Sequence, residues 1–400
     1  MKTLISFVLF MLPSLAVAGV WETTQDWTPQ TEASYQNWVA KSWDKNFFAK
    51  PGFYKDVKMD CADTVYAMRL VYASMNGLPF VMRDPTGGGG TISNEMDRWD
   101  DMGSEARKRA FLQFVYKVAS TSSLPRDSYP VAVSRSAIGS GRFLLTDPAS
   151  HHSWTVKYVS QQGIPFLLFS SRPARVQLFE RFEYPTMGFL FPQGLRPETN
   201  AGFRAFRKPE EIGLAVWEVS GYSLEQYKIP LKGWARQVQK KLALKSETGD
   251  QGLVRILGNA CRGAEERVEM VNKASALNAK LGSTCFSASQ YDDHSTPSRD
   301  VRLKGSFQEL QSTYAKLVEN GAKISPTVLA QVQSVLDGDE AAGRNAFCNI
   351  KISREEALSL GQVYVRSMND LLSSNPQDTV RMRWGLDRSP SSKARNCPEY

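Results

Sequence analysis

Histidine is scarce in this chain of 400 residues, which contains three: His151, His152 and His294. The five cysteines include no Cys-x-x-Cys pair and no close Cys/His cluster, so the sequence indicates neither a metal site nor a cofactor. The formal net charge is +8, but no dense Lys/Arg block with interleaved aromatics occurs, which argues against nucleic-acid binding. Beyond residue 18, no stretch approaches the roughly 18 apolar residues that a membrane-spanning helix needs.

The first 18 residues have the three parts of a signal peptide. Lys2 supplies positive charge, residues 4–15 are apolar, and residues 16–18 (Ala-Val-Ala) form a small-x-small cleavage site. No cysteine follows the apolar run to carry a lipid anchor. We therefore expect the mature chain to begin near Gly19 and to be periplasmic, in a Gram-negative-type envelope, or secreted, with no integral membrane segment after cleavage.

The cysteines divide the chain into two parts. Cys61 stands alone in the N-terminal half, whereas Cys261, Cys285, Cys348 and Cys397 lie in the C-terminal half. An odd cysteine in an exported protein is a candidate reactive thiol. We expect two disulfide bonds in a mainly helical domain at 236–400, and a free Cys61 in an α+β domain at 19–235.

The pairing of the four C-terminal cysteines is restricted by helix geometry. A straight helix at 264–281 would be about 27 Å long at 1.5 Å per residue. Cys261 and Cys285 flank its ends, while disulfide-bonded Cα atoms lie within about 7 Å. Each is therefore expected to pair with Cys348 or Cys397, in an order that the sequence leaves open.

Apolar spacing predicts a helix that starts at Cys61. Val65, Met68 and Tyr72 recur at helical intervals, and Asp60 is a suitable N-cap. Ser353 and Glu356 form a capping box for a later helix. Similar patterns predict further helices at 32–41, 104–118, 252–281, 306–320, 326–336 and 354–372, and extended segments at 129–135, 153–159 and 164–170.

Cys61 and His152 are the candidate catalytic pair. Free N–H groups and the dipole at the start of a helix favour a thiolate. Alternation along 153–159 puts His152 on the apolar face with Trp154, and His151 on the polar face. We expect the apolar face to pack against a helix, which would bring His152 to Cys61. Alternatively, Cys61 is a small buried residue on the stripe of Val65.

These residues also carry a family resemblance. Asp60-Cys61-Ala62-Asp63 leads a helix that ends at residues 76–80 (Asn-Gly-Leu-Pro-Phe), and a histidine opens a later β-hairpin. This pattern resembles the NlpC-type cell-wall cysteine peptidases and their bacterial transglutaminase-like relatives, over roughly residues 30–185. The resemblance implies a papain-like fold, in which the helix carrying the nucleophile Cys61 packs on a small antiparallel sheet that supplies the general base His152. Folding the hairpin brings Ser170 or Ser171 to the level of His152 as the orienting residue.

The function expected from these features is hydrolysis of an amide bond. Cys61 would attack, His152 would transfer the proton, and the backbone N–H of Cys61 would help to hold the oxyanion. The resemblance and the expected export imply peptidoglycan or another envelope peptide as substrate. Two alternatives stay open: an inactive binding or structural envelope protein on the same fold, and a transglutaminase-like acyl transferase. The oligomeric state is not indicated.

Overall fold

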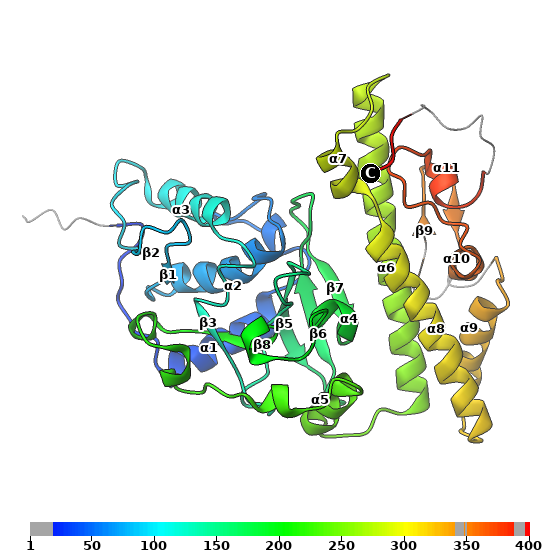
Figure 1. The fold of residues 1–400 in the computed structure, drawn as a ribbon, viewed down its shortest axis with the longest axis horizontal. Helices are drawn as coiled ribbons and strands as arrows, with labels where there is room; N and C mark the ends of the chain where they lie inside the picture. The colour runs from blue at the N-terminus through cyan, green and yellow to red at the C-terminus, as the bar shows by residue number, and fades with distance from the viewer. Residues whose placement is uncertain (1–18, 341–347, 349, 388–396) are drawn as a thin grey trace, which may run out of the picture.

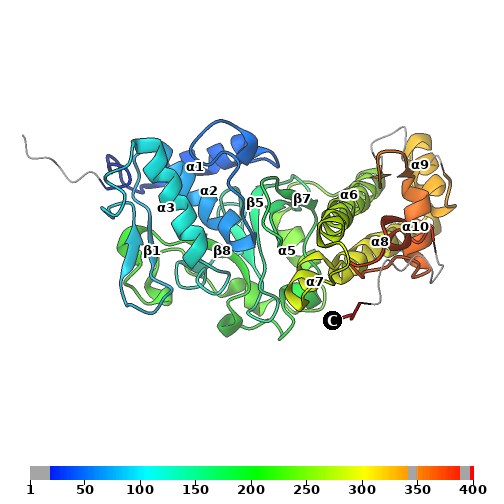
Figure 2. The same ribbon diagram turned by 90° about the horizontal axis from the view of Figure 1, so that it is seen from above.

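The computed structural model describes residues 19–340, 348, 350–387 and 397–400, so the predicted signal peptide lies outside the described residues. The N-terminal part contains a β-sheet covered by helices, and the C-terminal part is built around the long helix α6 (Figure 1). Seen from above, α6 lies beside the β7 edge of the sheet, and α8 packs against α6 (Figure 2).

The elements have the following bounds. The α-helices are α1 (Pro29–Ser42), α2 (Cys61–Met75), α3 (Ser104–Val118), α4 (Met187–Leu190), α5 (Trp234–Leu242), α6 (Gly249–Leu281), α7 (Ala288–His294), α8 (Pro297–Glu319), α9 (Pro326–Leu336), α10 (Leu360–Met368) and α11 (Val380–Arg383). The strands are β1 (Val81–Arg83), β2 (Thr91–Ser93), β3 (Ser128–Pro130), β4 (Phe143–Leu145), β5 (Ser153–Val159), β6 (Pro165–Phe169), β7 (Phe179–Phe182), β8 (Gly202–Phe206), β9 (Ile350–Lys351) and β10 (Ala357–Leu358).

The main sheet has six antiparallel strands in the order β3-β8-β4-β5-β6-β7. Neighbouring residues on one strand enter different cores, as the pleat requires. Phe143 and Leu168 belong to the core formed with α1, α2 and α3, whereas Leu144 and Leu167 belong to the core formed with α5. The sheet is therefore covered on both faces, and the antiparallel sheet expected beside the helix of Cys61 is present.

Helix α2 begins at Cys61, where the sequence predicts it. The Asp60 side chain accepts hydrogen bonds from the N–H groups of Ala62 and Asp63, and the Asp63 side chain accepts from the N–H of Asp60. This reciprocal capping box satisfies N–H groups that have no partner within the helix. Val65 and the residues that follow it on the same stripe are buried. Helix α2 therefore runs through the N-terminal core and holds Cys61 firmly at its start.

The C-terminal part is held by two disulfide bonds, Cys261–Cys348 and Cys285–Cys397. The prediction that Cys261 and Cys285 do not pair with each other is confirmed, and the order left open is resolved. Helix α6 is continuous from Gly249 to Leu281, so the helix predicted to keep Cys261 and Cys285 apart is present.

The helix predicted at 354–372 is present, but its predicted bounds are wrong, because α10 covers only Leu360–Met368. Ser353 accepts hydrogen bonds from the N–H groups of Glu355 and Glu356 in a turn that joins β9 to β10. Helix α10 begins only at Leu360, after a second capping box between Ser359 and Gln362. Two Ser-x-x-Glu/Gln patterns follow one another here. The first forms the turn between the paired strands β9 and β10, and the second caps α10.

Helix α5 packs with the sheet, whereas we expected the helical domain to start at 236. Trp234, Val238 and Leu242 are buried in the core on the sheet face opposite α2. The helical part therefore begins with α6 at Gly249.

Removing the Cys261–Cys348 bridge by replacing both residues with alanine is expected to lower the free energy of unfolding by about 2–4 kcal/mol, because this bridge spans 87 residues. Urea unfolding under oxidising conditions measures the change, with Cys61→Ala as a control that removes no bridge. An unchanged unfolding free energy would contradict the assigned connectivity.

Candidate active site around Cys61

Two strand ends fix the start of α2 on the sheet. Ser153, the first residue of β5, donates a hydrogen bond to the carbonyl of Cys61 at 2.9 Å. Ser170, which follows β6, donates to the carbonyl of Met59 at 2.7 Å, and the N–H of Arg175 donates to the same carbonyl at 3.0 Å. Cys61 is thus held at the end of the β5–β6 hairpin.

The backbone of His151 lies beside Cys61. The thiol Sγ lies 3.6 Å from the backbone oxygen of His151, whose side chain is exposed and whose φ of 45° is in the left-handed region. The loop before β5 is anchored by the buried Asp147, which accepts hydrogen bonds from the N–H groups of Ala149 at 2.9 Å and Gln193 at 3.0 Å. Asp147 therefore positions the loop that carries His151.

The expected pair of Cys61 and His152 is contradicted by the direction of the His152 side chain. Its ring lies 4.5 Å from that of Trp154, 5.4 Å from Phe169 and 5.8 Å from Phe189, between centroids. Trp154 and Phe169 belong to the core opposite α2. The predicted alternation along β5 is confirmed at this end of the strand, but His152 faces away from Cys61.

The error came from assuming that a helix packs only on the apolar face of β5. The polar face meets α2 and α1 instead, because its hydroxyl groups find partners there. Ser153 bonds the carbonyl of Cys61, and the Thr155 hydroxyl accepts a hydrogen bond from the indole of Trp43 at 3.1 Å. Buried hydroxyls with satisfied hydrogen bonds are compatible with a core.

Ser170 does not orient an imidazole. Its hydroxyl donates to Met59 on the α2 side of the sheet, whereas the His152 ring lies on the other side. The neighbouring Ser171 accepts a hydrogen bond at 2.7 Å from Arg299 of α8. Ser170 is therefore a positioning residue for the segment that leads into Cys61.

The Cys61 thiol is held in its protonated form. Burial, and then the negative charge of Asp60, raise the pKa of Cys61 to about 12, although the N–H of Ala62 acts in the opposite direction. Burial and Asp60 likewise raise the pKa of Asp63 to about 8. The helix start alone predicts a lowered thiol pKa, but desolvation and the capping carboxylate outweigh it.

Sequence reasoning missed two features of this protein. One is the position of His151, which the alternation already placed on the face of Ser153. The other is a cluster of charged side chains between the sheet and α6. Glu266 and Glu269 are three residues apart, a spacing that places two carboxylates on one face of a helix.

Within the described ranges, no group of three or more His, Cys, Asp or Glu side chains is placed to hold a metal ion. In the same part of the chain, no helix combines the length and the apolar character needed to cross a membrane. None of the family models, curated proteins or solved structures compared with this chain matches it.

Replacing Asp60 by asparagine is expected to lower the pKa of Cys61 by roughly one unit, because a neighbouring negative charge is lost. Asparagine is as good an N-cap as aspartate, so α2 should stay capped. The pH dependence of Cys61 alkylation in the folded protein measures the shift, with Glu319→Gln at the exposed end of α8 as the control. An identical profile in Asp60→Asn and the control would contradict the role of Asp60.

Burial, and then Arg302, lower the pKa of His152 from 6.5 to about 3. Between pH 6.5 and pH 3, His152 binds a proton in the unfolded chain but not in the folded chain. The free energy of unfolding therefore falls as the pH drops through this range, by at most about 1.4 kcal/mol per pH unit. His152→Phe, which keeps a ring beside Trp154, is expected to reduce this loss. Chemical unfolding at pH 7 and pH 5 compares it with His151→Gln, and equal acid sensitivity in both variants would refute a neutral buried His152.

Proposed function

We propose that the chain is an exported cysteine hydrolase that cleaves an amide bond in cell-wall or other envelope peptides, with Cys61 as nucleophile and His151 as general base. The observation that carries the proposal is the 3.6 Å approach of the Cys61 thiol to the backbone of His151 at the start of a helix packed on an antiparallel sheet. The substrate class rests on the resemblance to NlpC-type peptidases and on the signal peptide expected from the sequence.

The raised thiol pKa favours general-base catalysis over a resting thiolate–imidazolium pair. The exposed His151 side chain takes the thiol proton as sulfur adds to the substrate carbonyl carbon. The backbone N–H of Cys61 helps to hold the oxyanion. The imidazolium then protonates the leaving amine as the C–N bond breaks, and water hydrolyses the resulting thioester with His151 again as base.

The proposal is tested with p-nitrophenyl acetate as a generic acyl donor. Wild-type protein is expected to release p-nitrophenolate and to carry an acetyl group on Cys61, identified by peptide mass spectrometry. Cys61→Ala should lose both signals, and His151→Ala should slow acylation by about a hundredfold, as expected for loss of a general base.

His152→Phe is the matched control, because it removes the adjacent histidine on the opposite face of the sheet. It should acylate at the wild-type rate. Equal acylation in wild type and His151→Ala would refute the assigned base, and slowing in His152→Phe alone would restore the pair expected from the sequence. Release of new amino groups from purified peptidoglycan, dependent on Cys61, then tests the substrate class.

The second candidate is an envelope binding protein that keeps the fold without the chemistry. It is favoured by the thiol pKa of about 12, which leaves Cys61 protonated at neutral pH. Acetylation of Cys61 no faster than that of a free thiol of similar pKa would support this candidate. Incorporation of an added fluorescent amine into a glutamine-containing peptide would instead support the acyl transferase.

A further inference from the structure

A cavity of about 440 Å³ lies between the sheet and α8, on the sheet face opposite Cys61. Its apolar wall includes Trp154, Phe169 and Phe189, and its polar wall includes Arg181 and Arg302. Val301 lies at its edge with 71% of its surface exposed, so the cavity is open to solvent. This volume and this largely apolar lining are typical of small-molecule sites.

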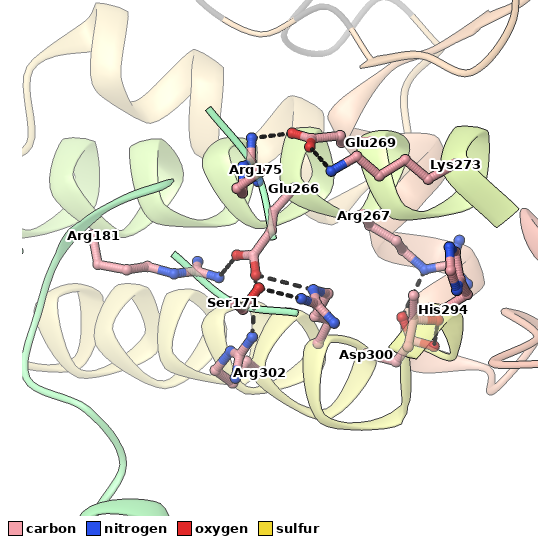
Figure 3. A network of polar contacts seen from close by, with 12 residues as sticks. Ser171, Arg175, Arg181, Glu266, Arg267, Glu269, Lys273, His294, Asp300 and Arg302 are labelled. Carbon is pink, nitrogen blue, oxygen red and sulfur yellow. Dashed lines mark hydrogen bonds and ion pairs between the residues drawn. The ribbon is translucent and has the colours of Figure 1, made fainter. Parts of the chain in front are cut away.

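The polar wall carries more positive than negative charge. Glu266 of α6 pairs with three guanidinium groups: Arg181, Arg299 at 3.1 Å and Arg302 at 3.3 Å (Figure 3). Glu183, which also lines the cavity, accepts a hydrogen bond from Asn259 at 3.0 Å. Of these charged groups, Arg181, Arg302 and Glu183 line the cavity at this end, so two cations and one carboxylate face it.

Arg302 presents a cation to the cavity. It lines the cavity, and 25% of its side-chain surface is exposed. Its Nη2 donates to Glu266 at 3.3 Å, a carboxylate that is shared with Arg181 and Arg299. A guanidinium that shares its counterion in this way binds an added anionic acceptor more strongly than a neutral one.

At the far end of the cavity the positive charge is paired with negative charge. Arg255 pairs with Glu247 at 2.8 Å and with Glu309 at 3.7 Å, so it offers no excess charge. The cavity therefore combines an aromatic wall with one positively charged end.

We propose that this cavity binds a small amphipathic carboxylic acid, with its apolar body against Trp154, Phe169 and Phe189 and its carboxylate at Arg302. The site is independent of the proposed hydrolase, because Cys61 lies on the other face of the sheet.

The test measures displacement of the fluorescent anion 1-anilinonaphthalene-8-sulfonate from the full mature chain by decanoate, decanol and decyltrimethylammonium. Decanoate is expected to displace it at concentrations about tenfold or more below those of the other two, because only decanoate carries a negative charge that can pair with the guanidinium of Arg302. Equal potency of decanoate and decanol would overturn the proposed acid specificity.

Two variants locate the site. Arg302→Gln should bring decanoate to the potency of decanol, whereas Lys304→Gln, the same charge change on an α8 residue that pairs with Asp370, should leave the difference intact.

Gly305 lines the cavity, and a Cβ there meets nothing within 4 Å. Gly305→Leu should therefore fill the cavity and abolish probe binding, with an unchanged or higher melting temperature because leucine favours helix more than glycine does. Unaltered probe binding in folded Gly305→Leu would place the probe elsewhere and overturn the proposal.

Discussion

Strand β5 is the element on which the rest of the N-terminal structure depends, because both of its faces are buried. Ser153 and Thr155 turn toward α2 and α1, where their hydroxyls bond Cys61 and Trp43. His152 and Trp154 turn toward the opposite core. A one-residue shift of this strand would exchange the faces and leave hydroxyl groups unpaired among aromatic rings. The hydrogen bonds of these hydroxyls therefore fix the register and, with it, which histidine lies beside Cys61.

Glu266 joins the two parts of the chain through ion pairs with arginines. This carboxylate is buried, and its neighbouring arginines, of which Arg181 comes from the sheet and Arg299 and Arg302 from α8, hold its pKa at about 2 against the effect of burial. Removing one member of a buried charge pair commonly costs about 3–5 kcal/mol, because the remaining charge is left without compensation. Such a cluster fixes how the helical part sits on the sheet.

Local signals predicted much of this fold, and the failures have physical causes. The start of α2, the bounds of α9 and the exclusion of a Cys261–Cys285 bridge follow from capping, spacing and helix length. The elements that cover the face of His152 do not follow from such signals, because alternation separates two faces of a strand without saying what packs on each. The helix expected from Ser353 failed for a similar reason, since only the pairing of β9 with β10 distinguishes a turn from a helix start. In both cases, contacts between residues far apart in the sequence determine the structure.

The same burial controls the chemistry on the two sides of β5. It holds Cys61 as a neutral thiol on one face and His152 as a neutral imidazole on the other, with pKa values of about 12 and about 3. A resting thiolate at Cys61 would need the pKa of the thiol to fall by several units, so the fold disfavours a resting thiolate–imidazolium pair. In the proposed mechanism the thiol proton is therefore removed during attack rather than before it. The backbone of His151 lies beside the thiol, whereas the His152 ring packs against Trp154 and Phe169 on the other face, which is why the proposed mechanism assigns the base to His151.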